Sequence, residues 1–200
     1  MPKSAFDAIS RSLPRYPQEV VELLIELAVE IAREGREGRR IGTLFTLGDE
    51  QTILRMSRPL ILDPLACHPR ESRMIQNPNL QGTIKELAQL DGAFIVSSDG
   101  EFCAACRYLE ASSETVDLPL GLGSRHLVAA SISALTDAVG IVVSESAIVR
   151  IFSGGKLVAE VLPEFWLLGR RILQLRGRVR EEHVSDLAVI TPETDEYAGG

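Results

Sequence analysis

Near the start of the chain, apolar residues recur every three to four positions, which predicts a long helix over residues 17–34. Pro17 suits the first turn of such a helix and Gly35 suits its end. The apolar positions are Val20, Val21, Leu23, Leu24, Leu27, Ala28 and Ile31. They form a wide stripe, so we expect this helix to be buried on more than one side.

The rest of the chain alternates between short apolar runs and amphipathic stretches. The apolar runs predict strands at residues 41–47, 94–97, 101–108, 140–145, 148–152 and 156–161. The amphipathic stretches predict helices at residues 50–56, 77–90, 124–137 and 164–182. Some strands follow one another as hairpins, while others are separated by helices. This order predicts an α/β fold with a single domain, in which a central mixed β-sheet is flanked by helices on both faces.

The same pattern divides the chain into four segments. Residues 1–40 are expected to be a helical segment that packs on the domain, and residues 41–162 are the domain itself. Residues 163–182 are predicted to be a C-terminal helix whose many arginines face solvent or bind an acidic partner or tail. Residues 183–200 contain acidic residues but no lysine or arginine, so we expect this tail to be at least partly disordered.

Composition narrows the functional classes. Of the 200 residues, 45% are hydrophobic and 24% are charged, which is typical of a folded globular protein. The net charge of −7 leaves no broad basic surface, so we expect no specific nucleic-acid binding. No apolar run has the length of a membrane span, and the N-terminus lacks the apolar stretch of a signal peptide. We therefore expect a cytoplasmic protein, which also suits three cysteines without a disulfide framework.

The first candidate site is the segment Gly121-Leu122-Gly123-Ser124-Arg125-His126, in which glycines precede a predicted helix. The free N–H groups at the start of a helix attract anions, and glycines let the backbone approach a phosphate closely. Ser124 is expected to cap the helix. Arg125 and His126 oppose the helix dipole unless an anionic ligand lies between them and the helix end. The alternative is an ordinary capped helix on which both side chains face solvent.

The second candidate site is Asp91-Gly92-Ala93, at the predicted junction between a helix and a strand. A carboxylate there could bind a divalent metal or accept a proton from a hydroxyl group. Gly92 would let a base or a sugar lie against the backbone. The alternative is a simple turn, because Asp-Gly is common in turns.

Together, the two segments resemble the diadenylate cyclase domain, in which Asp-Gly-Ala is followed by a hairpin and then by a motif such as Gly-Ser-Arg-His that opens a helix. Residues 41–49 resemble the early strand of that family. Residues 57–60, 84–88, 118–127 and 136–146 resemble its archaeal-type branch. The resemblance covers about residues 40–162, so residues 41–162 are identified as a diadenylate cyclase-like catalytic domain.

The resemblance implies a nucleotidyltransferase that joins two ATP into the second messenger cyclic di-AMP and releases two pyrophosphates. It places Asp91 near the attacking ribose 3′-hydroxyl, as metal ligand, base or both, and makes Arg125 and His126 catalytic residues at the phosphates. It implies a divalent metal cofactor, Mn²⁺ or Mg²⁺, that offsets phosphate charge. The residues implied for nucleotide binding are Gly92, Ala93, Leu109, Gly123, Ser124, Arg125, His126, Leu127, Ser144 and Glu145.

The implied product also predicts self-association. Cyclic di-AMP is two-fold symmetric, whereas the chain carries one copy of each motif. We therefore expect two subunits to meet face to face, each holding one ATP, as the arrangement needed for catalysis.

The chain departs from the family motif in three places. Ser124 replaces a threonine and keeps the hydroxyl, Leu127 replaces a basic residue, and Leu90 stands where some relatives have a histidine. Leu127 favours a second function, a non-catalytic module that binds ATP or cyclic di-AMP and regulates a partner. A third function, an oligomeric scaffold in which both motifs are structural turns, is disfavoured by the full residue pattern.

Cys103 and Cys106 form a CxxC motif that, with Cys67 and His68, invites comparison with a zinc site. The motif lies in a predicted strand, where residues three apart point to opposite faces and cannot bind one metal. We therefore predict that these cysteines are structural. A P-loop is excluded, because no Gly-Lys-Ser/Thr is present.

Overall fold

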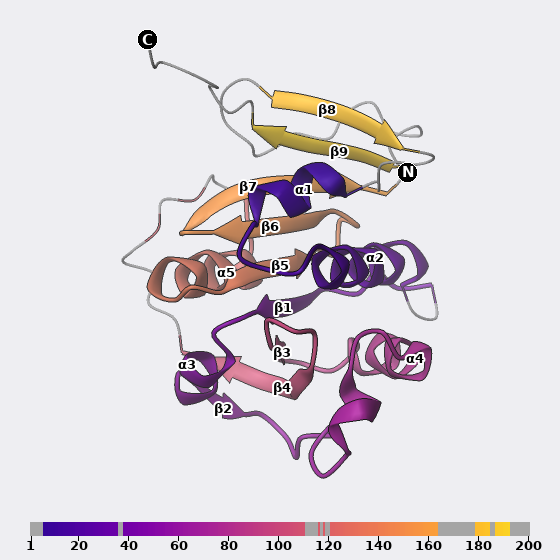
Figure 1. Cartoon of the computed structure of the whole chain (residues 1–200), viewed down its shortest axis with the longest axis vertical. Helices are drawn as coiled ribbons and strands as arrows, with labels where there is room; N and C mark the ends of the chain where they lie inside the picture. Colours follow the sequence, from indigo (N-terminus) through magenta and orange to yellow (C-terminus); the bar gives the residue numbers. More distant parts are fainter. Residues whose placement is uncertain are drawn as a thin grey trace.

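One mixed β-sheet lies at the centre of the molecule (Figure 1). The structure is a computed structural model and describes residues 6–35, 38–110, 116, 118, 121–163, 179–184 and 187–192. The strands in this part are β1 (Thr43–Leu47), β2 (Ser57–Pro59), β3 (Ala93–Val96), β4 (Phe102–Leu109), β5 (Val139–Val143), β6 (Val149–Ser153), β7 (Lys156–Leu162), β8 (Val179–Val184) and β9 (Leu187–Pro192). Their order is β2-β4-β3-β1-β5-β6-β7-β9-β8. The β1–β3 pair is parallel and the other described pairs are antiparallel.

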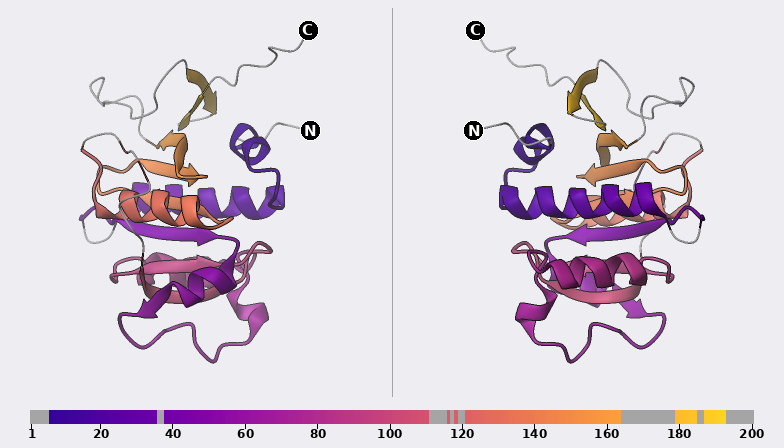
Figure 2. Two further views of the ribbon diagram at one scale, coloured as in Figure 1. Left: turned by 90° about the vertical axis from the view of Figure 1, so that its left-hand side faces the viewer. Right: turned by 90° about the vertical axis from the view of Figure 1, so that its right-hand side faces the viewer.

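Helices cover both faces of this sheet (Figure 2). They are α1 (Asp7–Ser12), α2 (Gln18–Glu34), α3 (Glu50–Arg55), α4 (Pro78–Leu87) and α5 (Ser124–Leu135), with a short 3₁₀ helix, η1, at Arg70–Arg73. Helices α2 and α4 share one hydrophobic core with the sheet, and α3 and α5 share the other. The predicted α/β fold with helices on both faces is therefore confirmed. Among the described residues, no helix combines the length and the apolar character needed to cross a membrane.

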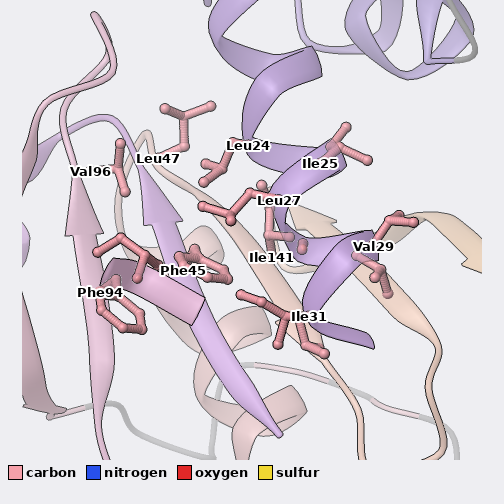
Figure 3. Close-up of a cluster of buried hydrophobic side chains, with 14 of the residues drawn as sticks. Leu24, Ile25, Leu27, Val29, Ile31, Phe45, Leu47, Phe94, Val96 and Ile141 are labelled. Carbon is pink, nitrogen blue, oxygen red and sulfur yellow. The ribbon is translucent and has the colours of Figure 1, made fainter. Parts of the chain in front are cut away.

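The strict alternation of strand side chains explains the two cores. In β1, Phe45 and Leu47 point toward α2, whereas Leu44 points toward α5. Figure 3 shows side chains of α2 meeting those of β1 and β3 in the first core. The rings of Phe45 and Phe94 stack there with centroids 5.1 Å apart. Because β1 is buried on both faces, polar side chains that could bind a ligand are expected at the ends of the strands.

The C-terminal region differs in part from the prediction of a helix at residues 163–182. Residues 164–178, most of that predicted helix, lie outside the described residues. Residues 179–182 belong to strand β8, and residues 187–192 form β9, which pairs with β7. The helix prediction was wrong for residues 179–182, because β9 pairs with the edge of β7 and β8 then pairs with β9, which gives the N–H and C=O groups of these edges partners. Val189 and Ile190, each 1% exposed, supply the apolar side chains that bury the added strand β9. The partly disordered tail stays a prediction, since residues 185–186 and 193–200 lie outside the described part of the chain.

Candidate functional site

The sheet topology gathers the candidate residues at one edge. Because β1 and β3 are parallel, the residues that precede them, Gly42 and Asp91, lie at the same edge of the sheet. Strand β5 is antiparallel to β1, so its end brings Ser144 and Glu145 to that edge as well. Helix α5 begins there too, because Arg125 in its first turn reaches Glu145. The two motifs that are about 30 residues apart in the sequence therefore form one site.

Arg125 lies between two carboxylates at this edge. Its Nη2 atom is 3.8 Å from Oδ1 of Asp91, and its Nη1 atom is 3.3 Å from Oε1 of Glu145. The carboxylate side chains are 91% and 71% exposed, so these ion pairs are weak and both carboxylates remain available to a ligand. The structure thus brings together Asp91, Arg125 and Glu145 as the sequence predicts.

Gly42 makes this arrangement possible. A Cβ atom at this position would lie 2.7 Å from Nη1 of Arg125 and 3.2 Å from Cγ of Glu145. Any other residue would therefore push the guanidinium away from its position. In the sequence, Gly42 stands only within a strand that resembles the family, and no local pattern marks it as a neighbour of Arg125.

The start of α5 opens into a pocket of about 410 Å³. The pocket is lined by Gly121, Leu122, Gly123, Ser124, Arg125, His126, Val142, Val143, Ser144, Glu145, Ser146 and Arg150. The N-cap residue is Gly123, and Ser124 is the first helical residue and makes no capping hydrogen bond. The prediction that Ser124 caps the helix was therefore wrong. Among the described residues no side chain caps α5, and the N–H groups of His126 and Leu127 donate to the Gly123 carbonyl, so those of Ser124 and Arg125 are available to an anion in the pocket.

His126 lies beneath this pocket and is 7% exposed. Arg150 on β6 donates from Nη1 to Nε2 of the imidazole over 3.2 Å, and its Nε donates to Oε1 of Glu160 on β7 over 2.7 Å. Because arginine only donates, Nε2 is the acceptor and the proton of the ring is on Nδ1. Burial, and after it the positive charge of Arg150, lower the pKa of His126 from 6.5 to about 4. The imidazole is therefore neutral near pH 7.

The remaining predicted residues take different positions. Leu109 and Ala93 are buried in the core beneath α5, whereas Leu127 is half-buried. Gly92 has a φ of +107°, and a Cβ atom there would lie 2.6 Å from the backbone carbon of Cys106. A close approach of β4 therefore requires this glycine. The Ser144 hydroxyl lies 2.7 Å from that of Ser146 at the pocket wall.

Sequence reasoning missed Arg150 and Glu160. Each is a charged residue within an otherwise apolar strand. This pattern is the signal in the sequence that could have identified them. They are directly opposite each other on β6 and β7, and their side chains are 6% and 0% exposed. Buried charges of this kind are uncommon unless they are paired, and they often belong to functional sites.

The CxxC motif does not bind a metal between its two cysteines. Cys103 packs against the core beneath α5, and Cys106 lies in the core beneath α2. The two thiols therefore point to opposite faces of the sheet, as predicted. Burial raises the pKa of Cys103 to about 11, so its thiol is protonated and unreactive.

The two carboxylates beside Arg125 fit a divalent cation better than the two cysteines do. No group of three or more histidine, cysteine, aspartate and glutamate residues within the described ranges could enclose a metal. Asp91 and Glu145 do offer two exposed oxygen donors on either side of Arg125. Mg²⁺ and Mn²⁺ are commonly held by one or two carboxylates together with substrate phosphates, so the residues present fit such a cation.

Comparisons with known proteins identify the family of this chain. The family model described as DisA bacterial checkpoint controller nucleotide-binding (DAC) matches residues 30–157. A diadenylate cyclase of Methanocaldococcus jannaschii is 46% identical over 153 residues, which cover 76% of this chain and 48% of that protein. A diadenylate cyclase of Haloferax volcanii is 40% identical over 146 residues, which cover 72% of this chain and 53% of that protein. This chain thus spans about half the length of these curated relatives.

A solved structure supports the fold alone. The hypothetical membrane spanning protein of Bacillus cereus has a TM-score of 0.56 and 18% sequence identity, and the match covers 78% of this chain and 70% of that one. The family match covers both motifs and the sheet edge that brings them together. The chain therefore belongs to the DAC family and resembles its archaeal members, as the motifs predicted.

Proposed function

We propose that this chain condenses two ATP into cyclic di-AMP with release of two pyrophosphates. The observation that carries the proposal is the position of Arg125 between Asp91 and Glu145, beside an uncapped helix start that opens into a pocket. A cation and free N–H groups suit a polyphosphate, and an exposed carboxylate next to them suits the activation of a hydroxyl group. The two archaeal relatives that are named diadenylate cyclases support the same reaction.

The chemistry assigned to these residues is mostly positioning and charge stabilisation. The 3′-oxygen of one ATP attacks the α-phosphorus of the other, the bond between the α-phosphorus and the bridging oxygen breaks, and pyrophosphate leaves. Asp91 orients the 3′-hydroxyl and accepts its proton. The guanidinium of Arg125 and the backbone N–H groups of Ser124 and Arg125 stabilise the charge that develops on the phosphates. The same step, with the nucleotides exchanged, closes the ring.

A divalent metal belongs to this proposal. Asp91, with Glu145 as the second carboxylate, would hold Mn²⁺ or Mg²⁺ together with the phosphates. Once bound, the metal would neutralise phosphate charge and favour departure of pyrophosphate. His126 is neutral near pH 7, so the proposal does not use it as a general acid. It lies beneath the pocket, where it accepts the hydrogen bond of Arg150.

We also propose that catalysis requires two subunits that meet face to face at this edge. Asp91 is almost fully exposed at the rim, outside the set of residues that line the pocket. The neighbouring side chain of Leu90 is 40% exposed, although leucine is usually buried. A second subunit facing this rim would bring its ATP to Asp91 and supply the other half of a symmetric product.

The reaction is tested by incubating the chain with ATP and Mg²⁺, Mn²⁺ or Co²⁺, followed by mass spectrometry and a pyrophosphate assay. We expect cyclic di-AMP and two pyrophosphates for each molecule formed. ATP that binds but remains intact with every metal would instead support a regulatory nucleotide-binding module, which Leu127 favours.

Asp91→Asn tests the carboxylate within the same assay. We expect turnover to fall by roughly a hundredfold or more, the scale for loss of a positioned acid–base group, while ATP binding persists. Asp99→Asn is a matched control, because Asp99 follows the opposite end of β3 and pairs with Arg70. Near-normal turnover of Asp91→Asn would refute the role of this carboxylate.

The requirement for two subunits predicts that specific activity rises with protein concentration and then reaches a plateau. Sedimentation measured over the same range should show dimers forming where the activity rises. Constant specific activity at concentrations where only monomer sediments would overturn the proposal.

A chain truncated to residues 1–162 tests the proposed division of the chain, in which the N-terminal helices and the domain at 41–162 suffice for the reaction.

A further inference from the structure

The pocket contains a second guanidinium that none of the family motifs includes. Arg150 lines the pocket although the residue is only 5% exposed. It lies on β6, on the same face of the sheet as α5, since its strand neighbours Val149 and Ile151 point into the core beneath α2. Its side chain therefore extends toward the start of α5, where His126 receives its hydrogen bond.

The contacts of Arg150 leave one nitrogen available to a ligand. Its Nε atom binds Glu160 and its Nη1 atom binds His126. The Nη2 atom makes no hydrogen bond to any residue that the structure describes. In the described part of the chain, fully buried polar atoms without a partner occur in Ser10, Thr43 and His126. Nη2 is not one of them, so it reaches the accessible space of the pocket.

The ion pair with Glu160 holds this guanidinium in place. The two residues are directly opposite on β6 and β7, and Glu160 is fully buried. Removing two charges from water is costly, and such pairs contribute little net stability. The pair does fix the direction of the charge, because its negative end is enclosed on β7 and its positive end faces the pocket.

We propose that Arg150 binds the phosphates of ATP at the floor of the pocket and supplies the positive charge that Leu127 does not. The inference rests on the proposed function for the identity of the ligand, and it adds a specificity-determining residue to that site. Arg125 binds the phosphates at the rim, where it is 38% exposed, and Arg150 binds them from below. Polyphosphate is therefore recognised from two sides, which favours ATP over AMP.

The test measures the binding of ATP and of AMP by calorimetry in an Asp91→Asn background, where ATP stays intact. Arg150→Gln keeps a donor for His126 but removes the charge. We expect ATP affinity to fall about tenfold or more, the scale for losing a charge-assisted hydrogen bond, while AMP affinity changes by less than about threefold. Arg150→Lys keeps the charge and should recover part of the loss for ATP.

Two further variants separate this role from a structural one. The single variant Arg150→Gln leaves the buried carboxylate of Glu160 without the positive charge of Arg150, which could prevent folding. The double variant Arg150→Gln with Glu160→Gln removes both charges, so the binding test can still be made. Arg73→Gln removes an arginine from a partly buried ion pair with Glu101, remote from the pocket, and should leave ATP affinity unchanged. Thermal unfolding followed by circular dichroism verifies that each variant is folded.

The outcomes distinguish this inference from the proposed function. A selective loss of ATP binding supports the role of Arg150 even if the wild-type chain makes no cyclic di-AMP. Equal losses of ATP and AMP binding, or no loss in a folded Arg150→Gln protein, would overturn the inference even if the wild-type chain is an active cyclase.

Discussion

The neutral, buried His126 makes the stability of this protein depend on pH in a calculable way. The pKa of its imidazole is lowered to about 4 in the folded state, chiefly by burial and then by Arg150. In the unfolded chain it returns to about 6.5. Between these two values the unfolded state binds a proton that the folded state does not, so stability falls as the pH falls through this range.

The magnitude follows from the two pKa values. Linkage gives a loss of roughly 2 kcal/mol in the free energy of unfolding between pH 7 and pH 5 from this residue alone. The loss becomes roughly 3 kcal/mol near pH 4 and then levels off, because below that pH both states bind the proton. Above about pH 7.5 the residue causes almost no pH dependence.

The assay is urea denaturation without nucleotide at pH 7, 6 and 5 for the wild type and His126→Gln. Glutamine can still accept the hydrogen bond of Arg150 but does not titrate, so other groups contribute equally to both proteins. The wild type should lose roughly 2 kcal/mol more than the variant between pH 7 and pH 5. His68→Gln, at an exposed loop position, controls for the removal of a histidine. Parallel losses in the wild type and His126→Gln would refute a neutral, buried His126.

Three other substitutions test the geometry of the site. Gly42→Ala would place a Cβ atom 2.7 Å from Nη1 of Arg125, so we expect ATP affinity, measured by calorimetry, to fall about tenfold with the urea midpoint nearly unchanged. Gly92→Ala meets the backbone of Cys106 at 2.6 Å and requires a φ of +107°, so urea denaturation should show a loss of roughly 2 kcal/mol or more. Arg125→Ala should weaken ATP binding more than AMP binding, because the guanidinium is placed at the phosphates, whereas equal losses would indicate a folding defect.

Local signals predicted most of the elements well. The wide apolar stripe of residues 17–34 corresponds to α2 at Gln18–Glu34, whose buried side chains pack on the sheet. Asn77 caps α4 by accepting a hydrogen bond from the Asn79 N–H over 3.0 Å, with Pro78 at the first helical position. Such patterns can be predicted from the sequence because periodicity, caps and turns depend on residues that are close together in the chain.

The errors arose where distant segments decide the structure. Residues 179–182, predicted to be helical, belong to β8 because the edge of β7 was available to β9, with which β8 then pairs. The N-cap of α5 moved from Ser124 to Gly123, a shift of one residue that depends on how the preceding loop meets the helix. Strand pairing and loop packing are non-local, so neither result could be read from a window of sequence.

The amino-acid sequence by itself determined most of the elements, the two motifs and the family to which they point, since these depend on residue types at short spacing. Only the tertiary structure decided that Gly42 gives Arg125 its space and that Arg150 and Glu160 lie opposite each other beneath the pocket. The physical reason is that a parallel pair and an antiparallel pair, β1 with β3 and β1 with β5, bring distant segments to the same edge. Charge, burial and close approach at that edge exist only once the sheet has formed.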